Sequence, residues 1–501
     1  MVGARSPARL GLVAAALGVL VSAAGSGVSP AAGAVPSPSA LHGSNALPRK
    51  ILIVSMAGLT WEDVAAGRAP ALASLARSWS VGALSIRSVG PRTDAPSAFA
   101  SLGAGNRARG GGPTDMKFAP NASPTAGGGL VVDQWKRVLA DNDRLHFEAV
   151  PGALGEALGG AGLRRAVVGN ADGGAVPPDA TRRRALGRER RRFAPLALAD
   201  SEGRVDAGEV GAHLIVADPG VPSGYRADPD SMLSASRFAL ARADVVLVEL
   251  ADTYREGQVV YASLLASDVP RPDENVPARI EAIGRDDALL EDLLGEVDLG
   301  RDTVLVLGAS GIGPTHRERL MVVAMAGVGA VRKGWLTSAT TRRDGIVTIS
   351  DLAPGILRLL GIDPPPSMTG LPVRAVPGGE GRLERLLDLQ ASALFHVRWV
   401  GAFFVVFVVL QFILYLVAWR RLSRGRTDRS GMLRVLTLGF MGVPVATLVQ
   451  SGVGAERLGI WQAPAVLVAT SALIAGLALA GPWSRRASGP SAFVCSLSVL
   501  V

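Results

Sequence analysis

The feature that most constrains this chain is an apolar stretch, residues 400–419, which contains no charged side chain. A helix needs about 20 such residues to cross the hydrocarbon core of a bilayer. Directly after this stretch come six arginines: Arg420, Arg421, Arg424, Arg426, Arg429 and Arg434. Because loops rich in Lys and Arg stay on the cytoplasmic side of a membrane, the segment is predicted to be a transmembrane helix that runs from outside to inside.

Two further apolar segments, 435–453 and 463–481, predict a second and a third span. Residues 491–501 are again apolar and predict either a truncated chain or the start of a fourth transmembrane helix. The three complete spans hold no Asp, Glu or His residue, although proton and ion pathways usually need such groups. The sequence therefore gives no indication of a transporter.

The N-terminal end of the sequence predicts export. Residues 1–34 are typical of a secretory signal peptide, since two arginines precede an apolar stretch over 10–24 and an Ala-Gly-Ala cleavage site follows at 32–34. An uncleaved N-terminal anchor is the alternative. A linker rich in Pro, Ser and Ala is predicted over 35–49. The whole pattern predicts a multi-pass protein of the cell membrane with an extracytoplasmic N-terminal domain.

The composition excludes some kinds of site and indicates which partners to expect. The one cysteine, Cys495, excludes an intrachain disulfide and a cysteine-based zinc site. Lys and Arg number 52 against 43 Asp and Glu. The densest basic run, 182–192, predicts either contact with anionic lipid headgroups or wall polymers, or a solvated loop. Because this run lies in the exported part, we expect the membrane and an envelope lipid, glycan or protein as partners, and no nucleic acid.

Short apolar runs alternate with helical patterns over the predicted exported domain, residues 50–378. Strands are expected at 51–55, 163–168, 244–249, 303–307 and 321–325, and helices at 71–78, 152–158 and 278–297. This alternation predicts an α/β fold, with a mostly parallel sheet and helices on both faces. Functional groups in such sheets lie at the carboxyl ends of the strands.

Two segments of the exported part lie outside this alternation. Insertions and the basic run are predicted over 106–240, where the Gly-rich stretch 106–146 is expected to be an insertion or a surface loop. Residues 379–399 space their leucines at helical intervals and predict an amphipathic juxtamembrane helix that leads into the first span.

Several of the strand ends share a pattern with a known family. The segments concerned are 51–58, 93–105, 246–252 and 303–311, followed by 348–362 and 366–370. In this order they resemble the alkaline phosphatase superfamily, which includes phosphodiesterases, sulfatases and cofactor-independent phosphoglycerate mutases. The resemblance covers about residues 50–375 and implies an alkaline phosphatase-like fold.

The resemblance also implies a site, in which Asp and His side chains hold two zinc or similar ions and a Ser or Thr hydroxyl acts as the nucleophile. The ions make the hydroxyl a better nucleophile and stabilise the charge on the transferring group. In this chain the nucleophile position falls on Ala95, or on Thr93 or Ser97 if the alignment is shifted. Of the metal positions, one falls on Asp252 and a second, altered one on Glu256.

The other metal positions of the resemblance fall on residues that bind zinc poorly: Ala57, Ala309, Ser310 and Thr369. We therefore expect a catalytically inactive domain, without a cofactor, that acts as a binding or accessory module of a membrane-anchored envelope protein. One alternative is an atypical zinc- or manganese-dependent hydrolase of phosphate or sulfate esters in envelope lipids or glycans. In the other alternative, the membrane region carries the function and the exported domain is accessory.

Overall fold

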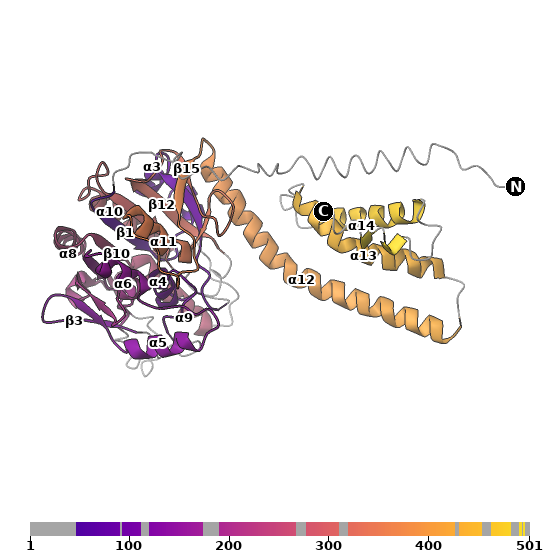
Figure 1. Cartoon of the computed structure of the whole chain (residues 1–501), viewed down its shortest axis with the longest axis horizontal. Coiled ribbons are helices and arrows are strands. Elements are labelled where there is room, and N and C mark those ends of the chain that lie inside the picture. The colour runs from indigo at the N-terminus through magenta and orange to yellow at the C-terminus, as the bar shows by residue number, and fades with distance from the viewer. Residues whose placement is uncertain are drawn as a thin grey trace. The chain divides into compact units, whose positions relative to one another are not determined.

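The computed structural model describes residues 47–90, 93–111, 120–173, 190–266, 277–309, 319–425, 430–452, 462–481, 490–492 and 494–495. The chain divides into two compact units. One is His42–Ala391, and the other combines Met1–Leu41 with Ser392–Val501. The α/β fold lies in the first of these units, and the long apolar helices lie in the second (Figure 1).

A ten-stranded sheet forms the centre of the unit His42–Ala391, in the order β15-β13-β2-β12-β11-β1-β10-β5-β7, with β14 also paired to β2. Its strands are β1 (Ile51–Met56), β2 (Ser80–Ser85), β5 (Arg165–Gly169), β7 (Ala207–Glu209), β10 (Val245–Leu250), β11 (Thr303–Leu307), β12 (Met321–Gly327), β13 (Gly334–Thr337), β14 (Ile346–Thr348) and β15 (Arg374–Pro377). The strands β11, β1, β10, β5 and β7 run parallel to one another. Strand β12 is antiparallel to both of its neighbours.

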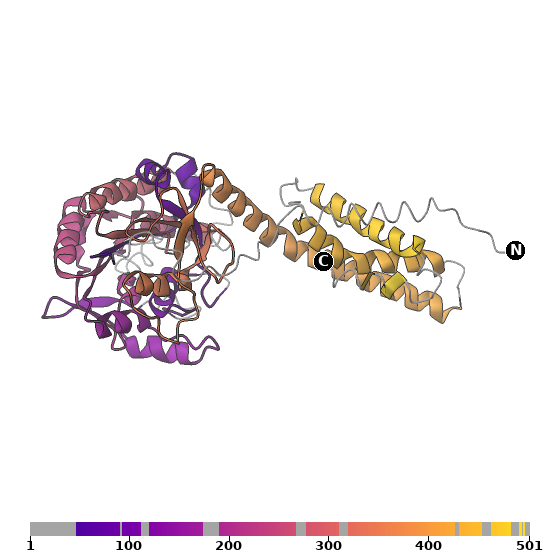
Figure 2. The same ribbon diagram turned by 45° about the horizontal axis from the view of Figure 1, so that its top comes forward.

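Helices cover both faces of this sheet (Figure 1; Figure 2). They are α2 (Trp61–Ala65), α3 (Pro70–Ala76), α4 (Ala95–Ala104), α6 (Ala153–Gly160), α8 (Pro229–Arg242), α9 (Asp252–Ala266), α10 (Pro277–Leu294) and α11 (Ile349–Leu359). Strand β1 explains the two layers, because its alternate residues face opposite sides of the sheet. Ile51 and Ile53 pack in the core with α4, α6 and α11, whereas Leu52 and Val54 pack with α3, α8 and α10.

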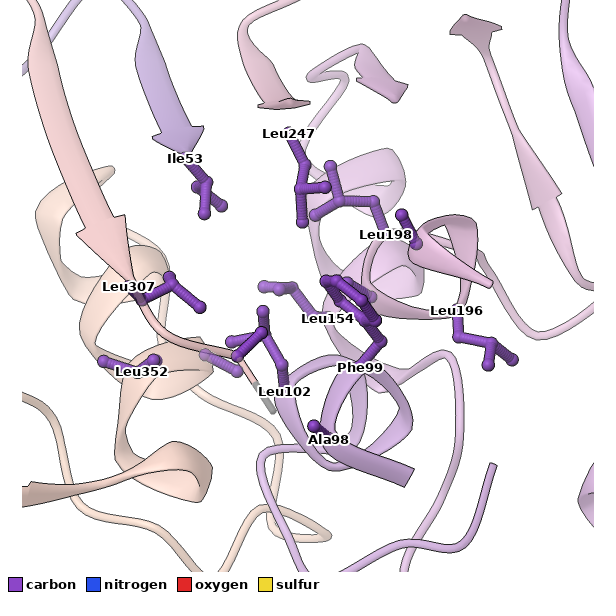
Figure 3. Close-up of a cluster of buried hydrophobic side chains, with 14 of the residues drawn as sticks. Ile53, Ala98, Phe99, Leu102, Leu154, Leu196, Leu198, Leu247, Leu307 and Leu352 are labelled. Atoms are coloured by element: carbon purple, nitrogen blue, oxygen red, sulfur yellow. The ribbon is translucent and has the colours of Figure 1, made fainter. Parts of the chain in front are cut away.

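The α4 side of the sheet is a continuous apolar core. Figure 3 shows Ile53, Leu247 and Leu307 reaching from three strands toward Phe99 and Leu102 of α4. These side chains are fully buried. Full burial of a side chain of this size contributes about 1.5–3 kcal/mol relative to leaving it exposed, so these contacts are a main source of the stability of this unit.

Smaller elements complete this unit. They are β3 (Ala122–Pro124), β4 (Leu130–Val132), α5 (Trp135–Asp143), η2 (Ala194–Ala197), β6 (Arg204–Val205), η3 (Ala212–Leu214), β8 (Ile215–Ala217) and β9 (Tyr225–Ala227). Strands β3, β4 and β6 form a second sheet, and β8 pairs with β9 in a third.

The predicted fold class is confirmed: the sheet is mostly parallel and has helices on both faces. All five predicted strands exist as β1, β5, β10, β11 and β12. The expectation of a loop over 106–146 is wrong where β3, β4 and α5 form, because Leu130, Val132 and Trp135 are buried in the core. Glycines are typical of loops, but Gly129 lies so close to the backbone of β6 that a Cβ would meet the Val205 carbonyl oxygen at 2.7 Å.

In the unit that contains Ser392–Val501, the described residues lie almost entirely in helices. Helix α12 (Arg382–Ser423) begins before the unit boundary, and α13 (Ser430–Gly452) and α14 (Gln462–Ala480) follow. Two stretches are long and apolar enough to cross a membrane, Gly401–Arg421 and Gly431–Val449, and α14 has a shorter apolar stretch, Pro464–Ala480. The orientation and the number of crossings stay predictions.

Several predicted segments lie wholly or largely outside the described residues. They are the signal peptide over 1–34, most of the linker over 35–49, most of the basic run over 182–192 and most of the apolar end over 491–501.

Candidate functional site

The carboxyl ends of β1, β10, β5 and β11 lie side by side at one edge of the sheet. The register aligns Ser55 of β1 with Glu249 of β10 and with Leu307 of β11, and it aligns Glu249 with Gly169 of β5. The residues that follow these strands therefore meet at the same edge. This is the edge at which α/β sheets carry their functional groups.

Two of the predicted ligand positions at this edge carry only methyl groups. Ala57 follows β1 and Ala309 follows β11, and both are buried in the apolar core with α4. An alanine side chain offers no atom that a metal ion could bind. Ser310, the next predicted ligand position after β11, lies outside the described residues.

Asp252 stands at the start of α9, directly beyond β10, and is 1% exposed. Its Oδ1 atom accepts hydrogen bonds from the Ala227 backbone N–H at 2.8 Å and from Nη2 of Arg255. Its Oδ2 atom accepts a hydrogen bond from Nε of Arg285 at 2.7 Å. Both oxygens of the carboxylate are thus engaged, and two guanidinium groups balance its charge.

These contacts set the ionisation of Asp252. Burial raises the pKa of its carboxyl, but the charge of Arg255 and the hydrogen bonds from Arg285 and Ala227 together outweigh burial, so the pKa lies below its ordinary value. The carboxylate is therefore charged at neutral pH.

Glu256 lies one turn further along α9 and is also buried. Its Oε1 atom accepts hydrogen bonds from the Ser223 hydroxyl at 2.6 Å and from the Ser223 backbone N–H at 3.3 Å. Its Oε2 atom is buried and has no hydrogen-bond partner among the described residues. Burial raises the pKa of Glu256, and the bonds from Ser223 offset this only in part.

Two further carboxyl groups are buried beside this edge. Asp286 of α10 accepts hydrogen bonds from the backbone N–H groups of Asp252 at 3.2 Å and Thr253 at 2.9 Å, and so satisfies the first turn of α9. Burial, followed by the charge of Asp252, raises the pKa of Asp286 to about 7. Burial raises the pKa of Glu249 to about 8.

The side chain of Glu249 lies over Gly169 of the neighbouring strand. A Cβ on Gly169 would meet the Glu249 Cβ at 2.6 Å and its Oε2 at 3.1 Å, so glycine is needed at this position. Oε2 of Glu249 and the hydroxyl of Ser55 are buried without a hydrogen-bond partner among the described residues.

The described residues at this edge do not fit a pair of divalent ions. Arg255 and Arg285 place two positive charges on Asp252, where a metal ion would be repelled and would have to displace them. The part of the chain that the structure describes holds no group of three or more His, Cys, Asp or Glu side chains placed to bind one metal ion. Among the described positions that the resemblance implies as ligands, Asp252 and Glu256 alone carry carboxyl groups, and a binuclear site needs more ligands than these two supply.

The candidate nucleophile positions lie at the start of α4. Ala95 is the first residue of this helix and is buried. The Thr93 hydroxyl accepts a hydrogen bond from the Ser88 backbone N–H at 3.0 Å. The Ser97 hydroxyl accepts one from the Gly110 backbone N–H at 3.2 Å. Both hydroxyls hold neighbouring chain segments in place.

Thr369, the last predicted ligand position, makes hydrogen bonds that hold two chain segments together. Its hydroxyl donates to Oδ1 of Asn106 at 2.8 Å, and its backbone N–H donates to the Gly105 carbonyl at 3.1 Å. Asn106 donates in turn to the Ser367 carbonyl at 3.3 Å. These bonds fasten the loop before β15 to the end of α4.

Sequence reasoning missed the two arginines that occupy the site. Arg255 lies inside the resembling region but has no counterpart in the implied ligand set, and Arg285 lies 33 residues beyond Asp252 on another helix. Glu249 carried a visible signal, because it is the only charged residue in the apolar run of β10.

Comparisons with known proteins give structural likenesses only. No protein-family model matches the chain. No curated protein matches it either. Among solved structures it is similar to a protein in the alkaline phosphatase superfamily from Vibrio parahaemolyticus, with 12% identity, a TM-score of 0.38, and coverage of 66% of this chain and 70% of that one.

Two further solved structures are similar to a comparable degree. The lipoteichoic acid synthase LtaP from Listeria monocytogenes has 11% identity and a TM-score of 0.37, over 64% of this chain and 73% of that one. The 2-O GAG sulfatase BT1596 has 10% identity and a TM-score of 0.41, over 65% and 73%. The solved structures to which this chain is similar thus include members of the alkaline phosphatase superfamily, whose motifs its sequence resembles.

Proposed function

We propose that the exported domain is catalytically inactive, folds without a metal ion, and serves as a binding or accessory module of a membrane-anchored envelope protein. The observation that carries this proposal is the engagement of Asp252. Its carboxylate accepts hydrogen bonds from Arg255, Arg285 and the Ala227 backbone, so the charge that would attract a metal ion is already balanced.

The absence of a reactive hydroxyl at the expected position supports the same proposal. Ala95 has no nucleophilic atom, and the hydroxyls of Thr93 and Ser97 accept structural hydrogen bonds. A hydroxyl needs an adjacent base or a metal ion to attack an ester at neutral pH, and the described residues hold no cluster of ligands for such an ion.

The two long apolar helix stretches support membrane attachment of this module. An extracytoplasmic position follows from the arginines after residue 419 and from the signal-like N-terminus. The proposed partner is a lipid, glycan or protein of the envelope.

The test uses the full chain, purified in detergent. Aryl-phosphate, phosphodiester and aryl-sulfate substrates are assayed with added zinc or manganese, and again after chelation. We expect no turnover above the buffer rate under either condition. Metal-dependent turnover that a chelator abolishes would instead establish the alternative, an atypical metal-dependent hydrolase of phosphate or sulfate esters.

A further inference from the structure

The β8–β9 hairpin is an element separate from the main sheet. Residues 215–227 form two short antiparallel strands, with Ile215 opposite Ala227 and Ala217 opposite Tyr225. The turn between them is held by its own bonds, because Asp218 accepts from the Gly220 backbone N–H and from Nε of Arg226. The hairpin therefore has hydrogen bonds of its own, separate from those of the ten-stranded sheet.

The hairpin buries little of itself against the rest of the unit. Of residues 215–227, Ser223 alone is buried, whereas Val216 and Tyr225 are exposed. An isolated two-stranded hairpin is marginally stable in water. Its position must therefore depend on specific contacts rather than on an apolar face.

Those contacts are hydrogen bonds to the two predicted metal positions of α9. Ser223 donates to Glu256 through both its hydroxyl and its backbone N–H. The backbone N–H of Ala227 donates to Asp252 at 2.8 Å. The segments at either end of the hairpin are fixed separately, because Asp228 donates from its backbone N–H to the carbonyl of the buried Leu214 at 3.0 Å.

Polar atoms at these anchors remain unsatisfied. Nε of Arg255, Nη2 of Arg285 and Oε2 of Glu256 are buried and have no hydrogen-bond partner among the described residues. A buried polar atom without a partner is costly, so this cluster is poised to make further bonds when it becomes accessible.

We propose that the β8–β9 hairpin is a hinged cover over the cluster of Asp252, Glu256, Arg255 and Arg285, and that it opens as a unit at residues 214 and 228. Opening releases three hydrogen bonds and exposes two carboxylates and two guanidinium groups. The inference rests on the proposed function in one respect, namely that this cluster is the ligand site of the binding module.

The test is hydrogen exchange by mass spectrometry on the full chain in detergent. Peptides over 215–227 are compared with peptides over β10, for the wild type and for Ser223→Ala. Local opening predicts that the hairpin amides exchange faster than those of β10 in the wild type. It also predicts a further increase of about tenfold in Ser223→Ala, which loses the hydroxyl hydrogen bond to Glu256, with no change in β10.

Ser231→Ala is the matched control, because the Ser231 hydroxyl donates to Asp228 beside the hairpin and not to α9. It is expected to leave exchange in 215–227 unchanged. A second readout is the rate of tryptic cleavage after Arg226, which follows opening of the same segment and is expected to rise in Ser223→Ala alone.

Exchange of 215–227 at the same rate as β10 in both proteins would overturn the proposal, since the hairpin would then open only when the whole unit unfolds. The turnover assays decide the proposed inactivity separately. If the protein were an active enzyme and the hairpin opened independently, the proposed function would be refuted, but the proposal that the hairpin is a hinged cover would stand.

Discussion

The interior of the ten-stranded sheet and its carboxyl edge are equally buried, but they are built from opposite chemistry. In the interior, β1, β10 and β11 present apolar side chains to both faces, with no group that needs a partner apart from Ser55, Thr303 and Glu249. At the edge, four charged or titratable side chains are buried: Asp252, Arg255 and Glu256 of α9, and Asp286 of α10, which contacts the start of α9. The interior is stable by burial alone, whereas the edge is stable only while its charges are matched.

The comparison shows how this edge differs from the metal site that the resemblance implies. Alanines at positions 57, 95 and 309 extend the apolar interior into the site. Arg255 and Arg285 supply positive charge within the chain itself. The carboxylate of Asp252 is thus paired within the chain itself.

The strongest test of this contrast replaces one residue from each region. Asp252→Ala leaves the buried Arg255 without its counter-ion, and breaking such a buried pair costs about 3–5 kcal/mol. Leu247→Ala removes a fully buried interior side chain and costs about 2–5 kcal/mol. Both losses are measured by chemical unfolding of the full chain in detergent.

A second substitution is expected to restore stability to one of these two variants and not to the other. Adding Arg255→Met to Asp252→Ala is expected to recover a large part of the lost stability, because the uncompensated charge is gone, and Leu247→Ala has no such partner. Equal stability of Asp252→Ala and the wild type would show that the edge does not depend on this ion pair.

A second prediction concerns Glu249, the unpaired carboxyl. Because its pKa is raised to about 8 in the folded state, its protonated form favours folding at low pH, and this contribution is lost as the pH rises from the unfolded value of 4.5 to about 8. Glu249→Gln, which stays neutral, is expected to show a smaller loss of stability over this range. A remaining slope is expected from Asp286, whose pKa is raised to about 7.

The measurement for Glu249 is the free energy of unfolding from pH 5 to pH 9, for the wild type and the variant. Leu250→Ile in the same strand controls for repacking. Identical pH slopes in the wild type and Glu249→Gln would mean that Glu249 ionises in the folded state as it does when unfolded.

The smallest expected effect lies at the first turn of α4. Asp94 accepts a hydrogen bond from the Ser97 backbone N–H at 2.7 Å and so caps the helix. Asp94→Ala is expected to cost about 1 kcal/mol, whereas Asp94→Asn keeps an accepting oxygen and is expected to cost less. Thermal unfolding of both variants checks this order, and a larger loss in Asp94→Asn would point to a role for the charge itself.

The sheet could be predicted from the sequence because its strands carry their own signals. The runs at 51–55 and 303–307 are apolar and short, as buried parallel strands are. Strand β2 gave no such run, because Gly82 and its small neighbours are fitted to Leu336 and Val323 of adjacent strands. Only the assembled sheet shows why a glycine belongs there.

The alanines at the edge of the sheet could be predicted from the sequence, but the arginine partners of Asp252 could not. Alanine at 57, 95 and 309 can be read directly from the sequence once the strand ends are recognised. The pairing of Asp252 with Arg285 cannot, because it joins the start of α9 to a residue in the middle of α10. The β8–β9 hairpin is equally hidden, since its bonds to Asp252 and Glu256 link segments that no sequence pattern relates.

The most direct test of the central claim is a calorimetric titration of the full-length protein in detergent with zinc and with manganese. Internal balance of Asp252 by Arg255 and Arg285 predicts no stoichiometric binding and no rise in the melting temperature with either ion. Stoichiometric binding that raises the melting temperature, and that Asp252→Ala abolishes, would contradict the claim and indicate that Asp252 is a metal ligand.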